Sequence, residues 1–473
     1  MISWIMIGLS TSNADVFVDS QVVGQQQGSF VLDDLNTEND TVQWLYTRSL
    51  LGYNGNYKTF RYALNLELLN SQVEGTESEL GLDVSPTIFR NPKQNMAGTW
   101  ILPRDAYVAT QFGDWGVQLG IQSFDWGLGI LSNSGTQATR FGVNQQGNIY
   151  TRLAVSRAFD TLHWFVATDA IVRDENALWS AGDRAYQAIT GLQYIQDGLR
   201  VGALSGFRYQ QDRESYATPF GPTSSWAIPV DTFATVQLSD SLQLASEMVG
   251  VWGRTTRLVN EATQGGEASI QYFGGVGRLQ HQRPTSSGKV ETLLETGWAS
   301  GDGNNGDATA RTFSLHSDYN VGLILYDEVL PSLQARSVER LADESLSAQP
   351  APGLQYAVPQ GGVNNSVYLQ LCSSLTHKNW LVRAAWMEAF SAVPYADPYQ
   401  TALHGGYSTG LNGEASDSIY LGAEADVRLQ YALKELVYMG VDAGYFMPGS
   451  ALDILEPTTK VLGYIQVKTG GQQ

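Results

Sequence analysis

Two carboxylates near the C-terminal end of this sequence have the spacing of a candidate catalytic pair. Glu424 and Asp426 are two residues apart in an alternating segment, so both side chains share one face of a predicted strand. A glycosidase needs two carboxylates about 5–9.5 Å apart. Arg428 continues the same row, which favours a ladder of paired charges over an acid and a base with different pKa values. The sequence also lacks HExxH and P-loop motifs, so we expect a protein that is not an enzyme.

A loop rich in Gly, Asp and Asn offers oxygen ligands for a metal ion. Asp302, Asn304 and Asp307 could together bind Ca²⁺, which prefers carboxylate and amide oxygens. The loop lacks the Glu of the twelfth EF-hand position, and a solvated turn is the alternative. We expect no other cofactor. The single Cys372 excludes an intrachain disulfide, a multi-cysteine zinc site and a CxxC pair, and the five His do not fall at metal-binding spacing.

The composition excludes several classes of protein. The chain has 473 residues, of which 16% are charged, 11% are aromatic and 49 are Gly, unlike a disordered chain or a coiled coil. The net charge of −19 gives no electrostatic reason to bind nucleic acid. No apolar run is long enough for a transmembrane helix. Residues 1–14 combine a short apolar run with a small-x-small sequence, and we interpret them as the end of a signal peptide.

Most of the chain alternates between apolar and polar residues with period two, as a strand with one apolar face does. In residues 57–70 the even positions are mainly Phe, Tyr and Leu, whereas the odd positions include Arg61, Asn65 and Glu67. Residues 162–173 and 418–431 repeat the pattern. The predicted strands are about 10–14 residues long, enough to cross a bilayer at a tilt.

The connections between these strands alternate in length. Tight turns are predicted near residues 160, 197, 240, 377 and 433, and the long polar connections include 125–148, 211–228, 331–365 and 392–417. Outer-membrane barrels have this pattern, with short periplasmic turns and long extracellular loops. We therefore predict an all-β fold, a single closed antiparallel transmembrane β-barrel of roughly 16–20 strands, centred on about 18. The barrel would occupy residues 42–473 and follow a periplasmic segment at 15–41.

Two details of the long connections can also be predicted. The alternation of loop lengths requires a tight turn between 301–310 and 331–365, and residues 317–320 are the best candidate. Residues 332–347 have the pattern of a short amphipathic helix. Because 331–365 is the longest connection, we expect it to fold into the barrel and narrow the lumen.

The polar faces of barrel strands line the lumen, and the apolar faces meet lipid. The charged residues placed inside by this rule include seven Arg and seven acids, so their charges cancel. We interpret them as pore-lining groups that select polar solutes; the alternative is that they only satisfy one another in a hydrated or plugged lumen. The predicted pore-lining residues are Arg61, Glu67, Arg152, Asp169, Arg173, Arg200, Arg208, Glu247, Glu267, Arg383, Glu424, Asp426, Arg428 and Asp442.

Aromatic residues near the strand ends are typical of the girdles at the two membrane interfaces of a barrel. Tyr150, Trp252, Trp380 and Tyr445 are among them. Inward-facing aromatic rings could instead stack on sugars, and Tyr420 and Tyr438 are the candidates with clear parity for that role.

Several short motifs resemble those of a known family of barrels. Residues 104–107 (Arg-Asp-Ala-Tyr), 119–122 (Leu-Gly-Ile-Gln) and 126–127 (Trp-Gly) resemble a region of alginate-export-type outer-membrane barrels. Residues 125–133 look even more like a related, functionally uncharacterised family of Gram-negative outer-membrane barrels, and 295–302 and 318–326 fit the same resemblance.

The resemblance implies an outer-membrane barrel but disfavours alginate as its substrate. The lumen of the alginate exporter is strongly basic, whereas this chain is acidic with mixed strand charges, and Ile121 stands where that family has Arg.

Taken together, these patterns predict a porin-like channel in the bacterial outer membrane for passive diffusion of small polar or ionic solutes, with saccharides among the candidates. Its partners would be outer-membrane lipid, lipopolysaccharide and the solute, and no nucleic acid. The alternatives are a secreted or surface β-rich binding or structural protein and, least favoured, a carbohydrate-active enzyme. Salt would extract either of these, whereas a barrel requires detergent.

Overall fold

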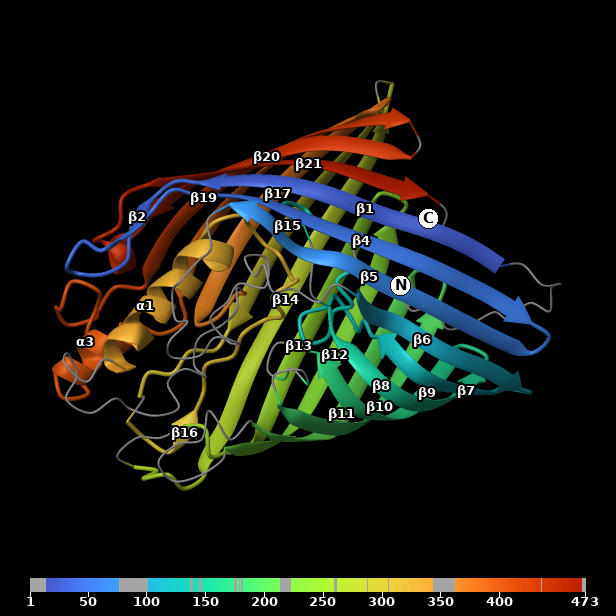
Figure 1. Ribbon diagram of the computed structural model, residues 1–473, viewed down its shortest axis with the longest axis horizontal. Coiled ribbons are helices and arrows are strands. Elements are labelled where there is room, and N and C mark those ends of the chain that lie inside the picture. The colour runs from blue at the N-terminus through green and yellow to red at the C-terminus, as the bar shows by residue number, and fades with distance from the viewer. Residues whose placement is uncertain are drawn as a thin grey trace.

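The computed structural model describes residues 14–75, 101–136, 139–143, 147–173, 177, 179, 182–212, 223–258, 262–286, 288–304, 306–342, 362–434 and 436–469. Nineteen strands in this part of the chain share one sheet. All but β16 (Thr309–Ala310), a two-residue strand that pairs in parallel with β14, form a closed antiparallel ring (Figure 1). The predicted all-β barrel is therefore confirmed, with 18 strands in the ring. No helix in the described ranges is long and apolar enough to cross a membrane.

The ring follows the order of the chain, and each strand pairs with its neighbours in sequence. Its strands are β1 (Ala14–Gln27), β4 (Val42–Tyr57), β5 (Phe60–Gly75), β6 (Ile101–Phe112), β7 (Trp115–Ser123), β8 (Ile149–Phe159), β9 (Leu162–Arg173), β10 (Arg184–Gln196), β11 (Leu199–Gln211), β12 (Ser224–Ser239), β13 (Leu242–Thr255), β14 (Ala268–Thr285), β15 (Gly288–Ala299), β17 (Ser366–His377), β18 (Trp380–Ser391), β19 (Tyr420–Lys434), β20 (Val437–Pro448) and β21 (Thr458–Thr469).

Strand β1 closes the ring by pairing with both β4 and β21. The prediction of a separate periplasmic segment at 15–41 is therefore wrong for residues 15–27, which belong to β1. Gln21, Val23 and Gln25 are buried while Val22 is 44% exposed, so β1 alternates like the other wall strands. The alternation is weak in the sequence because three of the inward positions, Gln21, Gln25 and Gln27, carry an uncharged amide. The predicted signal peptide lies outside the described residues, apart from Ala14 at the start of β1.

The connections fall on two rims. The tight turns, including those predicted near 160, 197, 240, 377 and 433, share one rim with the start of β1 and the end of β21, and the long connections share the other (Figure 1). The tight turns use residues with positive φ, as twisted hairpins require. These include Lys58, Gly113, Asp160, Gly198 and Lys378. The turn predicted at 317–320 is wrong, because the tight turn lies between Thr285 and Gly288, and 300–365 is one long connection from β15 to β17.

The long connections contain short elements of their own. These are β2 (Phe30–Val31), β3 (Glu38–Asn39), η4 (Leu325–Val329), α1 (Leu330–Ala342), α3 (Pro398–Leu403) and η6 (Ser450–Leu452). Helix α1 confirms the predicted amphipathic helix as far as Ala342, and the rest of that prediction lies outside the described residues. Leu333, Val338 and Leu341 are its buried apolar face.

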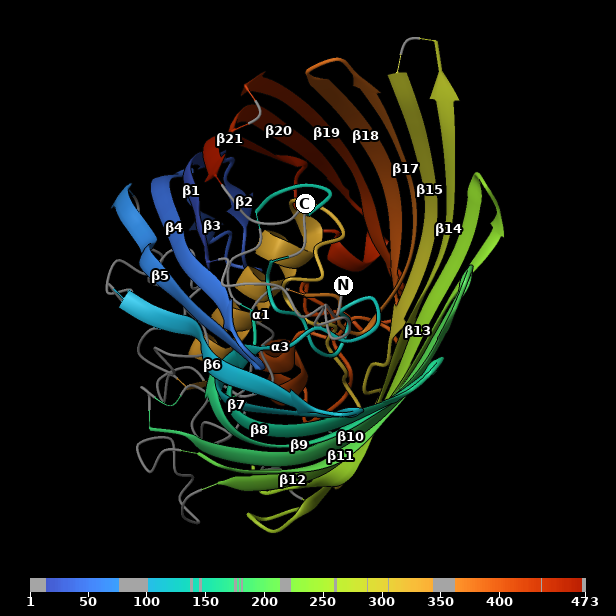
Figure 2. The ribbon, with the colours of Figure 1, turned by 90° about the vertical axis from the view of Figure 1, so that its right-hand side faces the viewer.

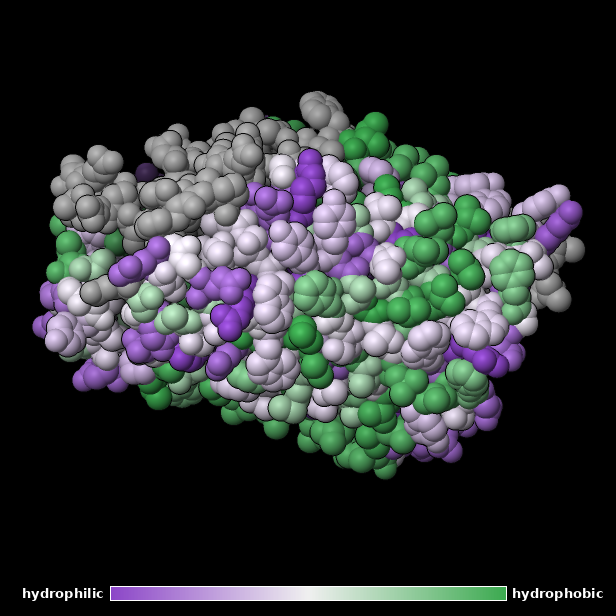
Figure 3. Space-filling view, turned by 90° about the horizontal axis from the view of Figure 1, so that it is seen from below, coloured by the Kyte–Doolittle hydropathy of each residue, from purple (hydrophilic) through white to green (hydrophobic). Residues whose placement is uncertain are grey.

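The outside of the ring carries the apolar face of each strand. On β5, Leu64 is 46% exposed while Glu67 is fully buried, as the alternation predicts. Apolar residues cover much of the wall in Figure 3 toward the end with the short turns. Trp252, Trp380 and Tyr445 lie exposed near strand ends, in keeping with aromatic girdles. Tyr150 does not, because it is buried inside the ring against Arg152.

Candidate functional site

The solvent exposure of the inward side chains changes along the axis of the ring. On β21 the inward Lys460 and Leu462 are buried, Gln466 is half-buried and Lys468 is exposed. On β17, Tyr368 is buried whereas Thr376 is exposed. We call the end nearer the long loops the long-loop half of the lumen and the other end the short-turn half. Water reaches the inward side chains in the short-turn half, whereas other protein groups cover them in the long-loop half.

Two connections fill the long-loop half: the β7–β8 loop (residues 124–148) and the β15–β17 loop (residues 300–365). Figure 2 looks in from the end with the short turns and shows coil and helix inside the ring. The larger apolar cluster includes Ile130 and Phe141 of the first loop, Leu315 and Leu323 of the second, and inward residues of the wall. The long-loop half therefore has a packed apolar core, as a soluble domain has.

The β7–β8 loop binds first to β12 and β13. The indole Nε1 of Trp126 donates to Oδ1 of Asp231 at 3.1 Å. The backbone N–H groups of Leu128 and Gly129 donate to one carboxylate oxygen of Glu247, the latter at 3.0 Å. Gly127 has φ +56°, and a Cβ there would collide with the Glu247 carboxylate, so the contact requires glycine. Here Glu247 anchors a loop.

The same loop then reaches the opposite wall. Arg140 donates through Nη2 to both carboxylate oxygens of Glu295 on β15, at 2.8 and 2.6 Å. Its carbonyl oxygen accepts from Nη1 of Arg383 on β18 at 2.8 Å. In the ring of 18, β18 is nine strands from β8, where the loop ends. The β7–β8 loop therefore spans the full width of the lumen.

Arg428 and Asp442 hold the next turn of this loop. They form a bidentate ion pair with N–O distances of 2.7 and 2.6 Å. Arg428 also donates to the carbonyl oxygens of Thr139 and Gly142, and the Gly142 N–H donates to Asp442 at 2.8 Å. Arg428 and Asp442 thus neutralise each other's charge, and each also forms hydrogen bonds with the loop backbone. The ion pair therefore fixes the position of the loop.

The β15–β17 loop is anchored by Glu424. Its two carboxylate oxygens accept the consecutive backbone N–H groups of residues 323–325, just before the helical segment. Lys460 on β21 donates to the Leu323 carbonyl oxygen at 3.1 Å and forms an ion pair with Glu328. Gln25 on β1 donates to the same Glu328 carboxylate at 3.2 Å. The Glu424 carboxylate, one of the two candidates for a catalytic pair, is therefore fully engaged by backbone amides.

The two loops are also bonded to each other. His316 Nε2 and Asn148 Oδ1 are 2.8 Å apart, and the Gly147 N–H donates to Asp318 at 2.6 Å. The His316 N–H donates to the Ile130 carbonyl oxygen at 2.9 Å. The motif at 318–326 is thus part of the junction between the two loops, which explains its polar start and apolar continuation.

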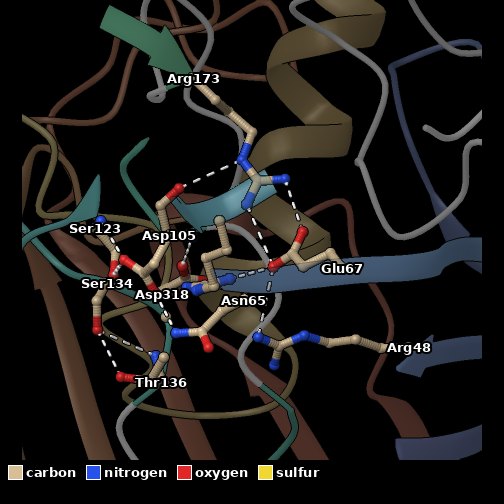
Figure 4. Close-up of polar contacts among 12 residues, drawn as sticks. Arg48, Asn65, Glu67, Asp105, Ser123, Ser134, Thr136, Arg173 and Asp318 are labelled. Atoms are coloured by element: carbon tan, nitrogen blue, oxygen red, sulfur yellow. Dashed lines mark hydrogen bonds and ion pairs between the residues drawn. The ribbon is translucent and has the colours of Figure 1, made fainter. Parts of the chain in front are cut away.

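Glu67 lies at the centre of a cluster of three arginines (Figure 4). Arg104 contacts it directly, Arg173 approaches within 3.2 Å and Arg48 within 3.6 Å. Beside the cluster, Asp105 accepts from Asn65 and from the Ser123 N–H, both at 2.9 Å. A register shift between β5 and β6 turns both Arg104 and Asp105 inward. The motif at 104–107 therefore fixes the base of the β7–β8 loop against the wall.

The extracellular mouth is covered by a separate set of contacts. Asp33 and Asp34, in the β1–β4 loop, form ion pairs with Arg336 and Arg340 of α1 at 2.9 and 2.6 Å. Arg340 also lies 3.8 Å from the ring centre of Tyr399 in α3.

Asp397 caps α3 by accepting the Gln400 N–H at 2.8 Å. Burial raises the pKa of the Asp397 carboxyl to about 6.

Most of the predicted pore-lining residues do face inward, but the structure pairs many of them with protein groups. Arg152 and Asp169 form a bidentate pair at 2.7 Å, and Arg200 lies over the Phe233 ring. The prediction that Glu267 lines the pore is wrong, because this residue precedes β14 and lies exposed beside Arg254 on the outer side of the rim. The residues that face inward are Arg61, Glu67, Arg152, Asp169, Arg173, Arg200, Arg208, Glu247, Arg383, Glu424, Asp426, Arg428 and Asp442.

The proposed Ca²⁺ ligands have another partner. Arg311 lies 3.3 Å from Asp302 and 2.9 Å from Asp307, and Asn304 is in the turn between these two acids. The described residues contain no group of three or more His, Cys, Asp or Glu that could hold a metal ion. The Ca²⁺ site stays a prediction, and a cation there would have to displace a guanidinium.

Several lumen residues were not predicted from the sequence. Arg140 lies in a loop, where strand parity has no meaning, and Arg48 and Arg104 lie in strands with irregular register. Arg278 and Glu295 are within recognisable alternating segments, so the same rule could have found them. Tyr420 is a wrong candidate for a sugar-stacking ring, because it packs on Phe390 and donates to Glu388 at the outer side.

The fold is that of an outer-membrane β-barrel. The outer membrane protein OprD from Pseudomonas aeruginosa has a TM-score of 0.51 with 10% identity, over 97% of this chain and 94% of that chain. The outer membrane protein opdK from the same organism has a TM-score of 0.50 with 9% identity, over 97% and 99%. No family model matches the chain, and no curated protein matches it in sequence. These likenesses show the barrel fold and do not show that the chain belongs to an alginate-export-type family.

Proposed function

We propose that this protein is a porin-like channel of the bacterial outer membrane, through which small polar or ionic solutes diffuse passively. The observation that carries the proposal is the closed ring of 18 strands with an apolar outside and a polar inside. A ring of this size is wider than its own side chains can fill, so whole loops or water must occupy the interior. Here loops occupy one half, and water reaches the inward side chains of the other.

The two inward loops are the proposed constriction. The prediction that 331–365 narrows the lumen is tested only for residues 331–342 and 362–365, because the rest lies outside the described residues. Within the described part of this connection, residues 313–329 make the inner contacts and α1 lies nearer the mouth (Figure 1). The β7–β8 loop, which spans the lumen, is the second part of the constriction. Passage of a solute requires the polar contacts of these loops with the wall to rearrange or to leave space beside them.

The same arrangement disfavours the alternatives. A secreted binding protein or a soluble enzyme would expose its ring of Leu, Val and Trp side chains to water, at a cost of about 25 cal/mol per Å². Glu424 and Asp426 are buried beside the β15–β17 loop, which leaves no access for a glycoside. We propose that this chain shares an ancestor with alginate-export-type barrels, but not their substrate. Lipopolysaccharide around the long-loop end is part of the same proposal.

Conductance of the purified, refolded protein in planar lipid bilayers tests the proposal. We expect discrete current steps in KCl and swelling of proteoliposomes in small polar solutes. Heat-modifiable migration on SDS gels verifies that the barrel is folded. A folded barrel that neither conducts ions nor supports swelling would overturn the channel function and favour a structural or adhesive role.

A further inference from the structure

We infer that the short-turn half of the lumen binds neutral, polyhydroxylated solutes, that is, saccharides. This inference rests on the proposed channel function and names a class of solute for it. Three observations carry it: a group of inward amide side chains, two tyrosines beside a second such group, and the absence of a dominant charge at this end among the described residues.

The first amide group crosses three neighbouring strands. Gln237 on β12 is directly opposite Gln243 on β13, and Gln243 is directly opposite Gln280 on β14. Gln243 donates to Gln237 at 3.2 Å, while the side-chain amides of Gln280 and the next inward residue, Gln282, have no hydrogen-bond partner among the described residues. All four are half-buried or exposed and point into the ring. The amides therefore form a row that faces solvent inside the barrel.

The second group combines amides with aromatic rings. Gln430 on β19 accepts from the Tyr464 hydroxyl at 3.1 Å, and Tyr438 on β20 is directly opposite Gln466 on β21. Tyr438 was the inward-facing aromatic residue expected from parity, and it is half-buried near the short turns. Aromatic rings offer an apolar face with a polar edge, which suits the C–H face of a sugar ring.

Amide side chains can bind hydroxyl groups because both groups are uncharged and both donate and accept hydrogen bonds. Each glutamine supplies two N–H donors and a carbonyl acceptor, and no change of pH within the physiological range alters them. A polyol or sugar presents several hydroxyls, each with one donor and lone pairs. A row of amides on adjacent strands, about 5 Å apart, can therefore bond successive hydroxyls of one molecule.

The charged residues of this half do not form a site for one sign of charge. Arg200 lies over the Phe233 ring, Arg383 donates to the Arg140 carbonyl oxygen, and Glu291 is 3.6 Å from Lys289. Asp19 accepts from Gln466 at 2.7 Å. Lys468 on β21 is also exposed at this end. Because cations and anions are both present, the charged groups favour neither sign of solute, and the uncharged amides can bond a neutral one.

Two measurements on the refolded full chain test the inference. Isothermal titration of the protein in detergent with the neutral trisaccharide maltotriose should show binding in roughly the millimolar range, typical of a few hydrogen bonds and a ring contact. In bilayers, maltotriose added at the short-turn side should interrupt the KCl current reversibly. The triple variant Q243A/Q280A/Q282A should weaken both effects about tenfold, the loss of roughly one hydrogen-bond equivalent.

The control is Gln271→Ala, on the same strand β14 but exposed on the outer side, which should change neither effect. Single variants at Gln280 and Gln282 keep the test valid if the triple variant does not fold. Ion conductance without maltotriose binding, equal binding by wild type and Q280A/Q282A, or stronger current block by gluconate would each overturn the saccharide inference alone. Binding without any ion conductance would overturn the channel function and leave the saccharide site.

Discussion

The two halves of the lumen are built from the same strands yet behave differently. In the long-loop half, inward residues such as Glu247, Glu295 and Glu424 are fully buried and bonded to loops. In the short-turn half, inward residues such as Gln282 and Glu291 remain accessible to water. The alternation along each strand is the same in both. The difference lies in what the rim supplies: connections of two or so residues cannot reach inward, whereas the connections at the other rim can cross the whole lumen.

The largest expected effect is on conductance. Replacing residues 126–142 by a short Gly-Ser linker removes the contacts of the β7–β8 loop with both sides of the barrel wall. We expect single-channel conductance to rise at least about twofold, because this loop no longer crosses the lumen. Shortening the β13–β14 loop (residues 256–267), whose Arg254–Glu267 pair lies outside the rim, is the matched control. Unchanged conductance in the first variant would mean that the loop does not limit the pore.

A second comparison contrasts two acids in the two halves. Glu424→Ala leaves three buried N–H groups of residues 323–325 without acceptors, and each such group costs about 1–3 kcal/mol. Glu291→Ala removes only a water-exposed pair with Lys289, worth about 0–1 kcal/mol. Urea unfolding in lipid vesicles, followed by Trp fluorescence, should show a large loss of stability for the first and little for the second. Equal losses would contradict the distinction between a filled and an open half.

A third prediction concerns pH at the mouth. Because burial raises the pKa of Asp397 to about 6, the folded state binds this proton more tightly than the unfolded chain does. The stability of α3 against local opening should therefore fall as the pH rises from about 4 to about 6, and stay constant above that. Hydrogen exchange of the α3 amides, corrected for intrinsic rates, measures this. In Asp397→Asn the pH dependence should vanish; its persistence would assign it to another group.

The smallest expected effect is on ion selectivity. The net charge of −19 is not matched by the inward wall residues, which are balanced in sign, so the excess lies in loops and turns. We expect a mild cation preference at low ionic strength that disappears near ~1 M salt, where the Debye length is about 3 Å. Reversal potentials in KCl gradients measure it. An anion preference at low salt would show that the lumen arginines control selectivity.

The sequence was enough to predict the ring and its two rims because strand alternation and loop length are local properties. Leu64 and Glu67 take their places from their neighbours alone. The same logic failed for β1, several of whose inward positions are Gln, and for the turn between Thr285 and Gly288, although Ser287-Gly288 is a turn signal.

The site was predicted less well, because its partners come from loops. Parity placed Glu247, Glu424 and Asp442 inside the barrel but could not show that backbone amides bind them. Arg140 could not be identified, since its role depends on a loop path across about half the ring of strands. Arg104 faces inward only through a register shift. Sequence periodicity predicts which face of a strand a residue occupies, but it does not predict the path of a long loop.

The bonds of Glu328 to Gln25 and Lys460 bear on how the chain assembles. These partners lie on β1 and β21, the two strands that meet last in sequence and close the ring, while Glu328 lies in the middle of the chain. Contacts of such high sequence separation form late, after a large loss of chain entropy. The β15–β17 loop must therefore be in place inside the curved sheet by the time its edges join. Ring closure and loop docking are then one cooperative step, and a chain that closes with this loop outside would leave Gln25 and Lys460 at the seam without their Glu328 partner.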